Sequence, residues 1–369
     1  MRIHLQRAFA ALVPALLCLG GTVQAQNEQS PSDQKSPTTS YYAEGSESRQ
    51  VSTGETAATP AAAPGWNTCP ACDCDDFCAA CENCPKRGMI LFSGFDSWRG
   101  VADGNRQNNN GGSSGFNYGT RLGRISDVTG IAFQAGGSFG LFDFSGRSNV
   151  GGTLNTVDAQ TQTFFTAGFF KKANENSPIS YGIVHDWQAN QNFGVFATNP
   201  TLGQWRGQVA YATSATNEFG AWGTLRDKGS SNINGLRESV SYRSINQVNF
   251  FWHHKWELGA DTWIWAGLPQ QDRLVGGGSL GDFLYGGMFT APLNNYVGVY
   301  ASAQYMHPSA APGPAASAQD SWNVSMGLQY YIGGHARTNT VAGNCWLPLM
   351  PVANNGSFLV DASRNSSVN

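Results

Sequence analysis

The sequence contains few charged residues. Asp, Glu, Lys and Arg together make up 13% of its 369 residues, about half their usual share in globular proteins. The net charge is −3, and there is no block of basic residues that would attract nucleic acid. We therefore expect no nucleic-acid partner.

Long apolar runs are also missing beyond the first 25 residues. A helix that crosses a membrane needs about 18 or more consecutive apolar residues, so a helical membrane protein is not expected. Residues 1–25 have the features of a secretory signal: Arg2 and Arg7, then an apolar stretch, then small residues that end at Ala25. We expect this segment to be removed on export.

Motifs for catalysis are absent. The sequence has no G-x-S-x-G, no HExxH, no P-loop and no dinucleotide fingerprint. Two pairs remain as candidates, His185-Asp186 and His253-His254. Neither pair has a serine at a telling distance. The two imidazoles of His253-His254 point to opposite faces of a strand, so both cannot bind one metal from regular strand geometry. We expect no enzyme activity and no cofactor.

Glycine and aromatic residues are abundant, and alternation is the main pattern. Glycine accounts for 45 residues and aromatics for 12%, while the mean hydropathy is only −0.30. Between Met89 and Ile332 the chain repeats runs of about ten residues in which apolar side chains alternate with small or polar ones. The twelve predicted strands are 89–97, 115–123, 130–144, 160–171, 178–188, 203–212, 217–226, 238–252, 254–267, 281–290, 295–306 and 320–333.

The breaks between these runs alternate between long and short. Six long breaks, rich in Gly, Asn, Ser, Gln and Pro, alternate with five short ones. Transmembrane β-barrels have short turns on the periplasmic side and long loops outside. A tilted ten-residue strand also spans about 25 Å, the height of the apolar band of such a barrel. The sequence therefore predicts an all-β, antiparallel transmembrane β-barrel of about twelve strands, with both chain ends in the periplasm.

The last run shows which side chains face which way. Trp322, Val324, Met326 and the following alternate residues are predicted to face lipid, and Asn323 and Ser325 to face the lumen. Charge on the lipid face would cost about 2–4 kcal/mol. The strand charges are therefore predicted to line the lumen, either as a weakly basic patch near the outer mouth or as structural ion pairs; the candidates are Arg206, Glu218, Arg226 and Arg243.

Six cysteines fall within sixteen residues before the barrel, at Cys69, Cys72, Cys74, Cys78, Cys81 and Cys84. Disulfides are favoured because an exported chain meets an oxidising compartment. The CxxC spacings leave a metal site as the alternative, with the metal unknown. Without Cys18, seven cysteines remain, including Cys345. An odd count suggests a free thiol or a disulfide to a neighbouring chain.

Five segments follow from these patterns. They are a signal peptide (1–25), a disordered linker (26–68) of low hydrophobicity, a Cys-rich module (69–87), the barrel (88–334) and a C-terminal tail (335–369). The N-terminal part before the barrel is expected to act as a tether.

The barrel region resembles an uncharacterised family of planctomycete exported proteins. The resemblance rests on the stretch Leu91 to Gly104, on Gly115 to Gly123, on Gly130 to Gly140, and on the closing Trp322 to Gly334 with Trp346-Leu-Pro-Leu in the tail. It covers about residues 88 to 360. The resemblance implies a barrel-like exported protein and no assigned activity.

These observations predict an outer-membrane protein whose partners are the lipid bilayer and the barrel-assembly machinery. The leading expectation is a porin-like passive channel for small solutes. The alternatives are a structural anchor whose Cys-rich module cross-links to neighbours or the cell wall, a surface-binding protein that uses its long loops, and a soluble exported β protein.

Overall fold

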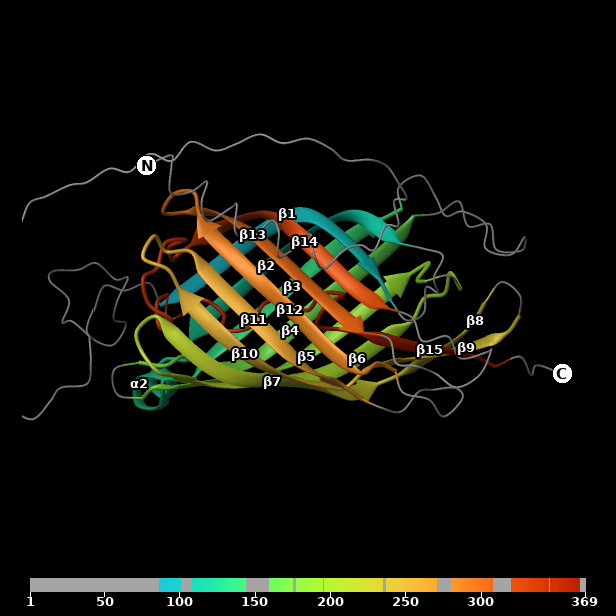
Figure 1. The fold of residues 1–369 in the computed structure, drawn as a ribbon, viewed down its shortest axis with the longest axis horizontal. Coiled ribbons are helices and arrows are strands. Elements are labelled where there is room, and N and C mark those ends of the chain that lie inside the picture. The colour runs from blue at the N-terminus through green and yellow to red at the C-terminus, as the bar shows by residue number, and fades with distance from the viewer. Residues whose placement is uncertain are drawn as a thin grey trace, which may run out of the picture. The chain divides into compact units, whose positions relative to one another are not determined.

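Twelve antiparallel strands form the wall of a closed barrel. The computed structural model describes residues 86–100, 108–143, 159–174, 177–194, 196–234, 237–270, 280–307, 320–344 and 346–365. Each wall strand pairs with its neighbours, and β1 pairs with β14 to close the ring (Figure 1). The prediction of a twelve-stranded antiparallel barrel is confirmed. The wall strands are β1 (Arg87–Arg99), β2 (Asn109–Arg121), β3 (Ala132–Phe142), β4 (Gln160–Lys171), β5 (Ile179–Gln191), β6 (Thr201–Ala212), β7 (Asn217–Lys228), β10 (Gln247–Lys255), β11 (Asp261–Pro269), β12 (Phe283–Pro292), β13 (Val297–His307) and β14 (Ser321–Ile332).

The two ends of the barrel differ in their connections. One end, here called the short-turn end, carries the connections 122–131, 172–178, 213–216, 256–260 and 293–296. The other, the long-loop end, carries the remaining six connections, which confirms the predicted alternation. The connection 122–131 holds the helix α2 (Arg124–Thr129). Within the described residues, no helix is both long enough and apolar enough to cross a membrane.

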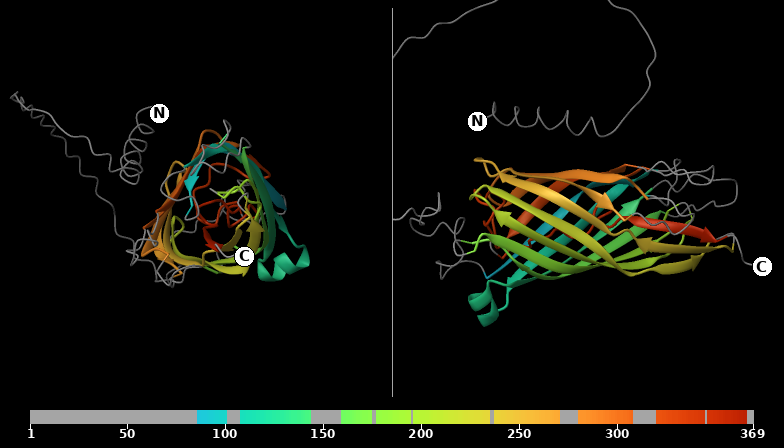
Figure 2. Two further views of the ribbon diagram at one scale, coloured as in Figure 1. Left: turned by 90° about the vertical axis from the view of Figure 1, so that its right-hand side faces the viewer. Right: turned by 60° about the horizontal axis from the view of Figure 1, so that its bottom comes forward.

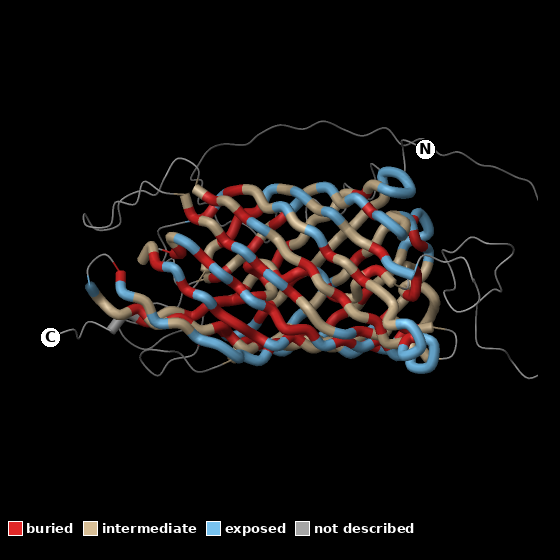
Figure 3. Tube along the Cα trace, turned by 180° about the vertical axis from the view of Figure 1, so that it is seen from behind, coloured by how far each residue is buried: buried red, intermediate tan, exposed pale blue. Residues whose placement is uncertain are grey.

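Burial alternates along several wall strands, such as β5 and β14, as the sequence predicts (Figure 3). In β14, Met326, Leu328 and Tyr330 are exposed, whereas Asn323 and Ser325 are buried. The register explains this, since Asn323 and Ser325 are paired across the wall with Trp98 and Asp96 of β1, and all four point inward. The prediction for the two faces of the last strand is confirmed.

The outer surface of the barrel is apolar. Large apolar side chains that are 40–70% exposed project outward from nearly every wall strand, and examples are Phe116, Phe139, Phe165, Ile183, Trp205, Val209, Phe219, Phe250, Ile264 and Leu328. Soluble proteins rarely expose apolar patches larger than a few hundred Å². The distribution is thus the reverse of a soluble barrel, with apolar groups outside and polar groups inside.

A small second sheet lies at the long-loop end, where the sequence predicted a single strand over 238–252. The chain forms β8 (Ser230–Ile233) and β9 (Ser239–Ser244) before β10 begins at Gln247. The break follows from packing: Ile245 turns into an apolar cluster with Leu280, Leu284, Met306 and Leu359. The prediction of one continuous strand is therefore wrong, and β9 leaves the barrel wall.

The C-terminal segment passes through the barrel. β14 ends at Ile332 at the short-turn end, yet β15 (Val360–Asn365) pairs with β9 at the long-loop end. Residues 333–359 connect the two, and the end-on view in Figure 2 shows this segment inside the ring of strands. The prediction that the C-terminal end stays on the side of the short turns is wrong. The alternation of long and short breaks gives the number and direction of the wall strands, but it does not give the path of the chain after the last of them.

Candidate functional site

The inner face of the barrel is polar and buried. Its side chains are mostly uncharged amides and hydroxyls, namely Asn117, Gln134, Gln162, Thr166, Gln188, Gln204, Asn249, Gln304 and Asn323. Buried polar groups need hydrogen-bond partners. In this lumen the C-terminal segment supplies many of them, so the segment and the wall match each other chemically.

Two lysines hold the C-terminal segment at the short-turn end. Lys172 Nζ donates to the carbonyl oxygen of Asn344 at 2.9 Å, and Lys255 Nζ donates to Thr338 Oγ1 at 2.8 Å. The Ala336 amide also donates to the carbonyl oxygen of Asn295. Burial, reinforced by the charge of Lys255, lowers the pKa of Lys172 to about 7. The charge on this anchor therefore changes near neutral pH.

The middle of the segment is held by backbone recognition. Gln134 Oε1 accepts from the amides of Leu349 and Met350, both at 3.2 Å, and Gln134 Nε2 donates to the Met350 carbonyl oxygen at 3.0 Å. The Ala353 amide donates to Thr166 Oγ1 at 3.0 Å. One glutamine thus contacts both polar sides of the same backbone turn, which fixes the position of the segment.

A buried ion pair supports this contact. Arg206 Nε and Nη2 donate to the Asp186 carboxylate at 3.0 and 3.1 Å, and Arg206 Nη2 also donates to the carbonyl oxygen of Pro351 at 2.7 Å. Thr166 and Gln204 donate to the same carboxylate. Such bidentate pairs combine energy with geometric specificity. Arg206 therefore links the wall to the segment.

Apolar side chains close the lumen at the long-loop end. Trp98, Phe142 and Leu202 of the wall pack with Val352 and Phe358 of the C-terminal segment, together with β9 residues. Trp98 stacks on Phe193 with ring centroids 5.5 Å apart. A second cluster around Leu359 adjoins the small sheet. The described residues at this end of the barrel form a packed apolar core.

Charged side chains gather at the short-turn end of the lumen. His253 contacts Glu218 through Nδ1 at 3.0 Å and Asp261 through Nε2. Lys255 Nζ lies 2.8 Å from Asp261, and Ser180 donates to Glu218. Each carboxylate in this group has a basic partner. The two carboxylates are balanced by Lys255 and, when it is protonated, by His253.

The four predicted lumen residues occupy different places. Arg206 and Glu218 are 4% and 3% exposed on the inner face, whereas Arg226 lies exposed near the long-loop end of β7. Arg243 belongs to β9, outside the wall, and pairs with Asp361 of β15 at 3.2 Å. Because Arg206 and Arg243 both have aspartate partners, the structure favours ion pairs over a free basic patch.

The other candidates are also placed or set aside by the structure. His185 faces outward between Trp187 and Trp205 and contacts Asp227, whereas Asp186 faces the lumen. The six cysteines from Cys69 to Cys84, and Cys345, lie outside the described residues. Within the part that is described, no group of three His, Cys, Asp or Glu side chains is arranged to hold a metal ion.

Sequence reasoning missed the partners of the wall in the tail. Residues 335–369 were predicted as a separate segment, yet Met350, Val352 and Phe358 belong to the buried core. One signal was present: large apolar residues recur between Leu347 and Val360. Large apolar side chains favour burial, so their recurrence in the tail indicates a segment that packs against other parts of the protein.

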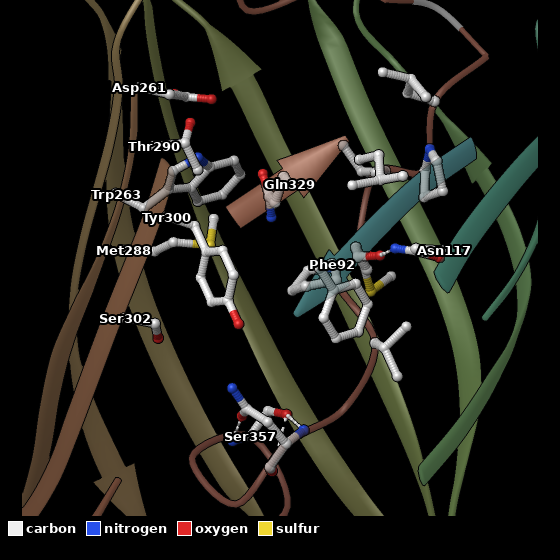
Figure 4. Close-up of a pocket in the computed structure, with 18 of the residues that line it drawn as sticks. Phe92, Asn117, Asp261, Trp263, Met288, Thr290, Tyr300, Ser302, Gln329 and Ser357 are labelled. Atoms are coloured by element: carbon white, nitrogen blue, oxygen red, sulfur yellow. Dashed lines mark hydrogen bonds between the residues drawn. The ribbon is translucent and has the colours of Figure 1, made fainter. Parts of the chain in front are cut away.

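A cavity of about 300 Å³ remains beside the C-terminal segment. Figure 4 shows Phe92, Trp263, Met288 and Tyr300 around it, with the segment residue Ser357 on its other side. Its lining extends from residues of the short-turn end such as Lys172 to residues of the long-loop cluster such as Phe142. The lumen therefore holds a cavity beside the C-terminal segment, which acts as a plug.

Comparisons with solved structures find channels and porins at low similarity. A deletion mutant of the monoaromatic hydrocarbon channel TodX is similar at a TM-score of 0.36 with 8% identity, over 68% of this chain and 93% of that one. The KdgM porin gives 0.35 with 9% identity, over 66% and 98%. The anion-selective porin from Comamonas acidovorans gives 0.30 with 8% identity, over 67% and 98%. No curated protein sequence matches the chain.

One family model matches the chain, and its limits agree with the extent of the resemblance noted in the sequence. It begins at the first wall strand and ends where β15 begins, so it includes both the barrel and the segment that fills it. From the match over residues 88–360, the chain belongs to the family of unknown function DUF6666.

Proposed function

We propose that this protein is an outer-membrane β-barrel that is closed by its own C-terminal segment and works as a porin-like channel for small solutes only when that segment is displaced. The observation that carries the proposal is the threaded segment, which occupies the lumen from Ala336 to Val360. The expected export signal, the assembly machinery and disulfide-linked neighbours remain proposals that accompany it.

The outer surface supports a location in a membrane. Wall strands of 9–13 residues, tilted as in other barrels, are long enough for an apolar band of about 25 Å. A closed barrel leaves no unpaired strand edge in the lipid, which is the requirement for spanning with strands. In the orientation usual for outer-membrane barrels, the short turns of this barrel lie in the periplasm and its long loops lie outside the cell.

The Ile183→Arg variant tests the membrane location. Ile183 is 53% exposed near the middle of β5. If it faces lipid, we expect the variant to lose about 2–4 kcal/mol of stability in lipid vesicles, measured by urea unfolding. The control is Val128→Arg in α2, where Val128 is 86% exposed and the cost is expected to stay within about 0.5 kcal/mol. Equal, small costs at both positions would indicate a soluble exported β protein instead.

The position of the C-terminus gives a second test. β15 lies at the long-loop end, so a peptide tag added after Asn369 is expected to bind antibody on intact cells. The control is a tag inserted in the turn 213–216 at the opposite end, which is expected to bind only after the outer membrane is opened. A C-terminal tag that needs the same treatment would contradict the threaded path.

The closed state also favours a structural role as the second candidate. A barrel sealed by packed aromatic side chains is a stable anchor, and its threaded chain presents different segments at its two ends. The two functions differ in conductance. We expect the full chain to give no steady conductance in planar bilayers, and only a channel protein would conduct once the segment is removed.

A further inference from the structure

One carboxylate on the inner face of the barrel differs from the others. Asp186 contacts Arg206, Glu218 contacts His253, and Asp261 contacts both His253 and Lys255. Asp96 of β1 is 4% exposed, and no ion pair joins it to a basic side chain of the described residues. A buried charge without a counter-charge is costly. Among these four carboxyl groups, only Asp96 lacks a basic partner in the described residues.

The polar contacts of Asp96 orient its carboxylate without neutralising it. Asn323 Nδ2 donates to Asp96 Oδ1 at 2.6 Å, and the Asn355 side chain of the C-terminal segment also bonds to Asp96. Amide donors stabilise a carboxylate but add no positive charge. The carboxyl group is therefore held in place from the wall and from the plug, and Asp96 is among the residues that line the cavity.

Aromatic rings surround the cavity next to this charge. Phe92 precedes Asp96 by four residues on the same face of β1, and its ring meets that of Tyr300 edge to face with centroids 6.5 Å apart. Asp96 lies close enough to Tyr300 to act electrostatically on its hydroxyl group. Trp222 and Trp265 form a second edge-to-face pair in the lining, at 6.1 Å. Aromatic faces attract cations, most strongly where water is excluded.

Phe92 and Asp96 are separated on the inner face by Gly94, which is paired directly with Gly327 of β14. A Cβ atom at either glycine would meet the backbone of the facing strand, so the two glycines allow β1 and β14 to approach closely here. Phe92, Asp96 and Tyr300 line one part of the cavity, here called the recess.

We propose that this recess binds a small organic monocation, an ammonium or guanidinium group on an apolar body. The carboxylate of Asp96 neutralises the cation, and the rings of Phe92 and Tyr300 contact its apolar part. The ligand enters from the short-turn end, because the apolar clusters close the other. Binding does not require conductance or a bilayer, so this inference stands or falls independently of the proposed channel function.

Isothermal titration of the full chain in detergent micelles tests the proposal. The probes are phenyltrimethylammonium, benzenesulfonate of opposite charge, and glucose as a neutral polar molecule. We expect saturable binding of the cation alone. The Asp96→Asn variant keeps the size and the hydrogen-bonding oxygen of the side chain, and we expect it to weaken cation binding by about tenfold or more, as for the loss of a charge-assisted contact.

Two further variants keep the test decisive if Asp96→Asn fails to fold. Phe92→Leu removes a ring and is expected to weaken cation binding severalfold, whereas Tyr300→Phe keeps its ring and is expected to bind like the parent. Asp227→Asn, outside the lumen with a half-exposed side chain, serves as the matched charge control and should change nothing. Cation binding that is unaffected by both Asp96→Asn and Phe92→Leu, or tighter binding of benzenesulfonate or glucose, would overturn the proposal.

Discussion

Deletion of residues 335–369 is expected to turn a silent barrel into a conducting one. The deletion removes the backbone groups of the C-terminal segment that Gln134, Arg206 and Gln304 bind. It also removes Val352 and Phe358, which the segment contributes to the apolar cluster at the long-loop end. What remains is a twelve-stranded wall with a polar inner face. Barrels of this size lie between filled eight-stranded barrels and open sixteen-stranded porins. We expect steady single-channel conductance from this variant, whereas the full chain is expected to give none.

The matched control for this deletion removes only residues 366–369, which follow β15. This shorter deletion keeps the plug and the small sheet, so it is expected to stay silent. Insertion of both variants is checked by a change in electrophoretic mobility after boiling in SDS. A deletion of 335–369 that inserts but does not conduct would contradict the channel proposal and favour the anchor.

Substitution of Asp186 by alanine is expected to destabilise the barrel by about 3–5 kcal/mol. The change leaves the Arg206 guanidinium, 4% exposed, without its anion in a site that solvent does not reach. It also removes the acceptor for Thr166 and Gln204. Unfolding in urea, followed by the loss of β-sheet circular dichroism in micelles, measures the cost.

Two comparisons separate this effect from a general loss of charge. Asp227→Ala removes the half-exposed partner of His185 and should cost no more than about 1 kcal/mol, as for other exposed pairs. The double variant Asp186→Ala, Arg206→Met removes both charges and is expected to recover much of the stability, because an apolar replacement leaves no buried charge. A double variant as unstable as the single one would show that the ion pair is not the reason.

The wall of the barrel could be predicted because its cause is local. Along each wall strand, successive side chains face lipid and lumen in turn. This period of two can be read from the sequence of runs such as Trp322 to Ile332. The break at Ile245 could not be predicted in this way. It depends on contacts with Leu280 and Leu359, which are distant in the chain. Arg243 was predicted to line the lumen for the same reason, whereas it lies in β9 and its partner Asp361 is 118 residues away.

By itself the sequence determined the number of wall strands, their directions and the faces that they present, because these follow from alternation and from the lengths of the breaks between strands. Only the tertiary structure decided the state of the lumen. The C-terminal segment has no strand pattern between Gly333 and Leu359, and its place is fixed by amide and arginine side chains from several different strands. Such contacts carry no periodicity, so the closure of the barrel became visible only when the folded wall brought those side chains together around one backbone.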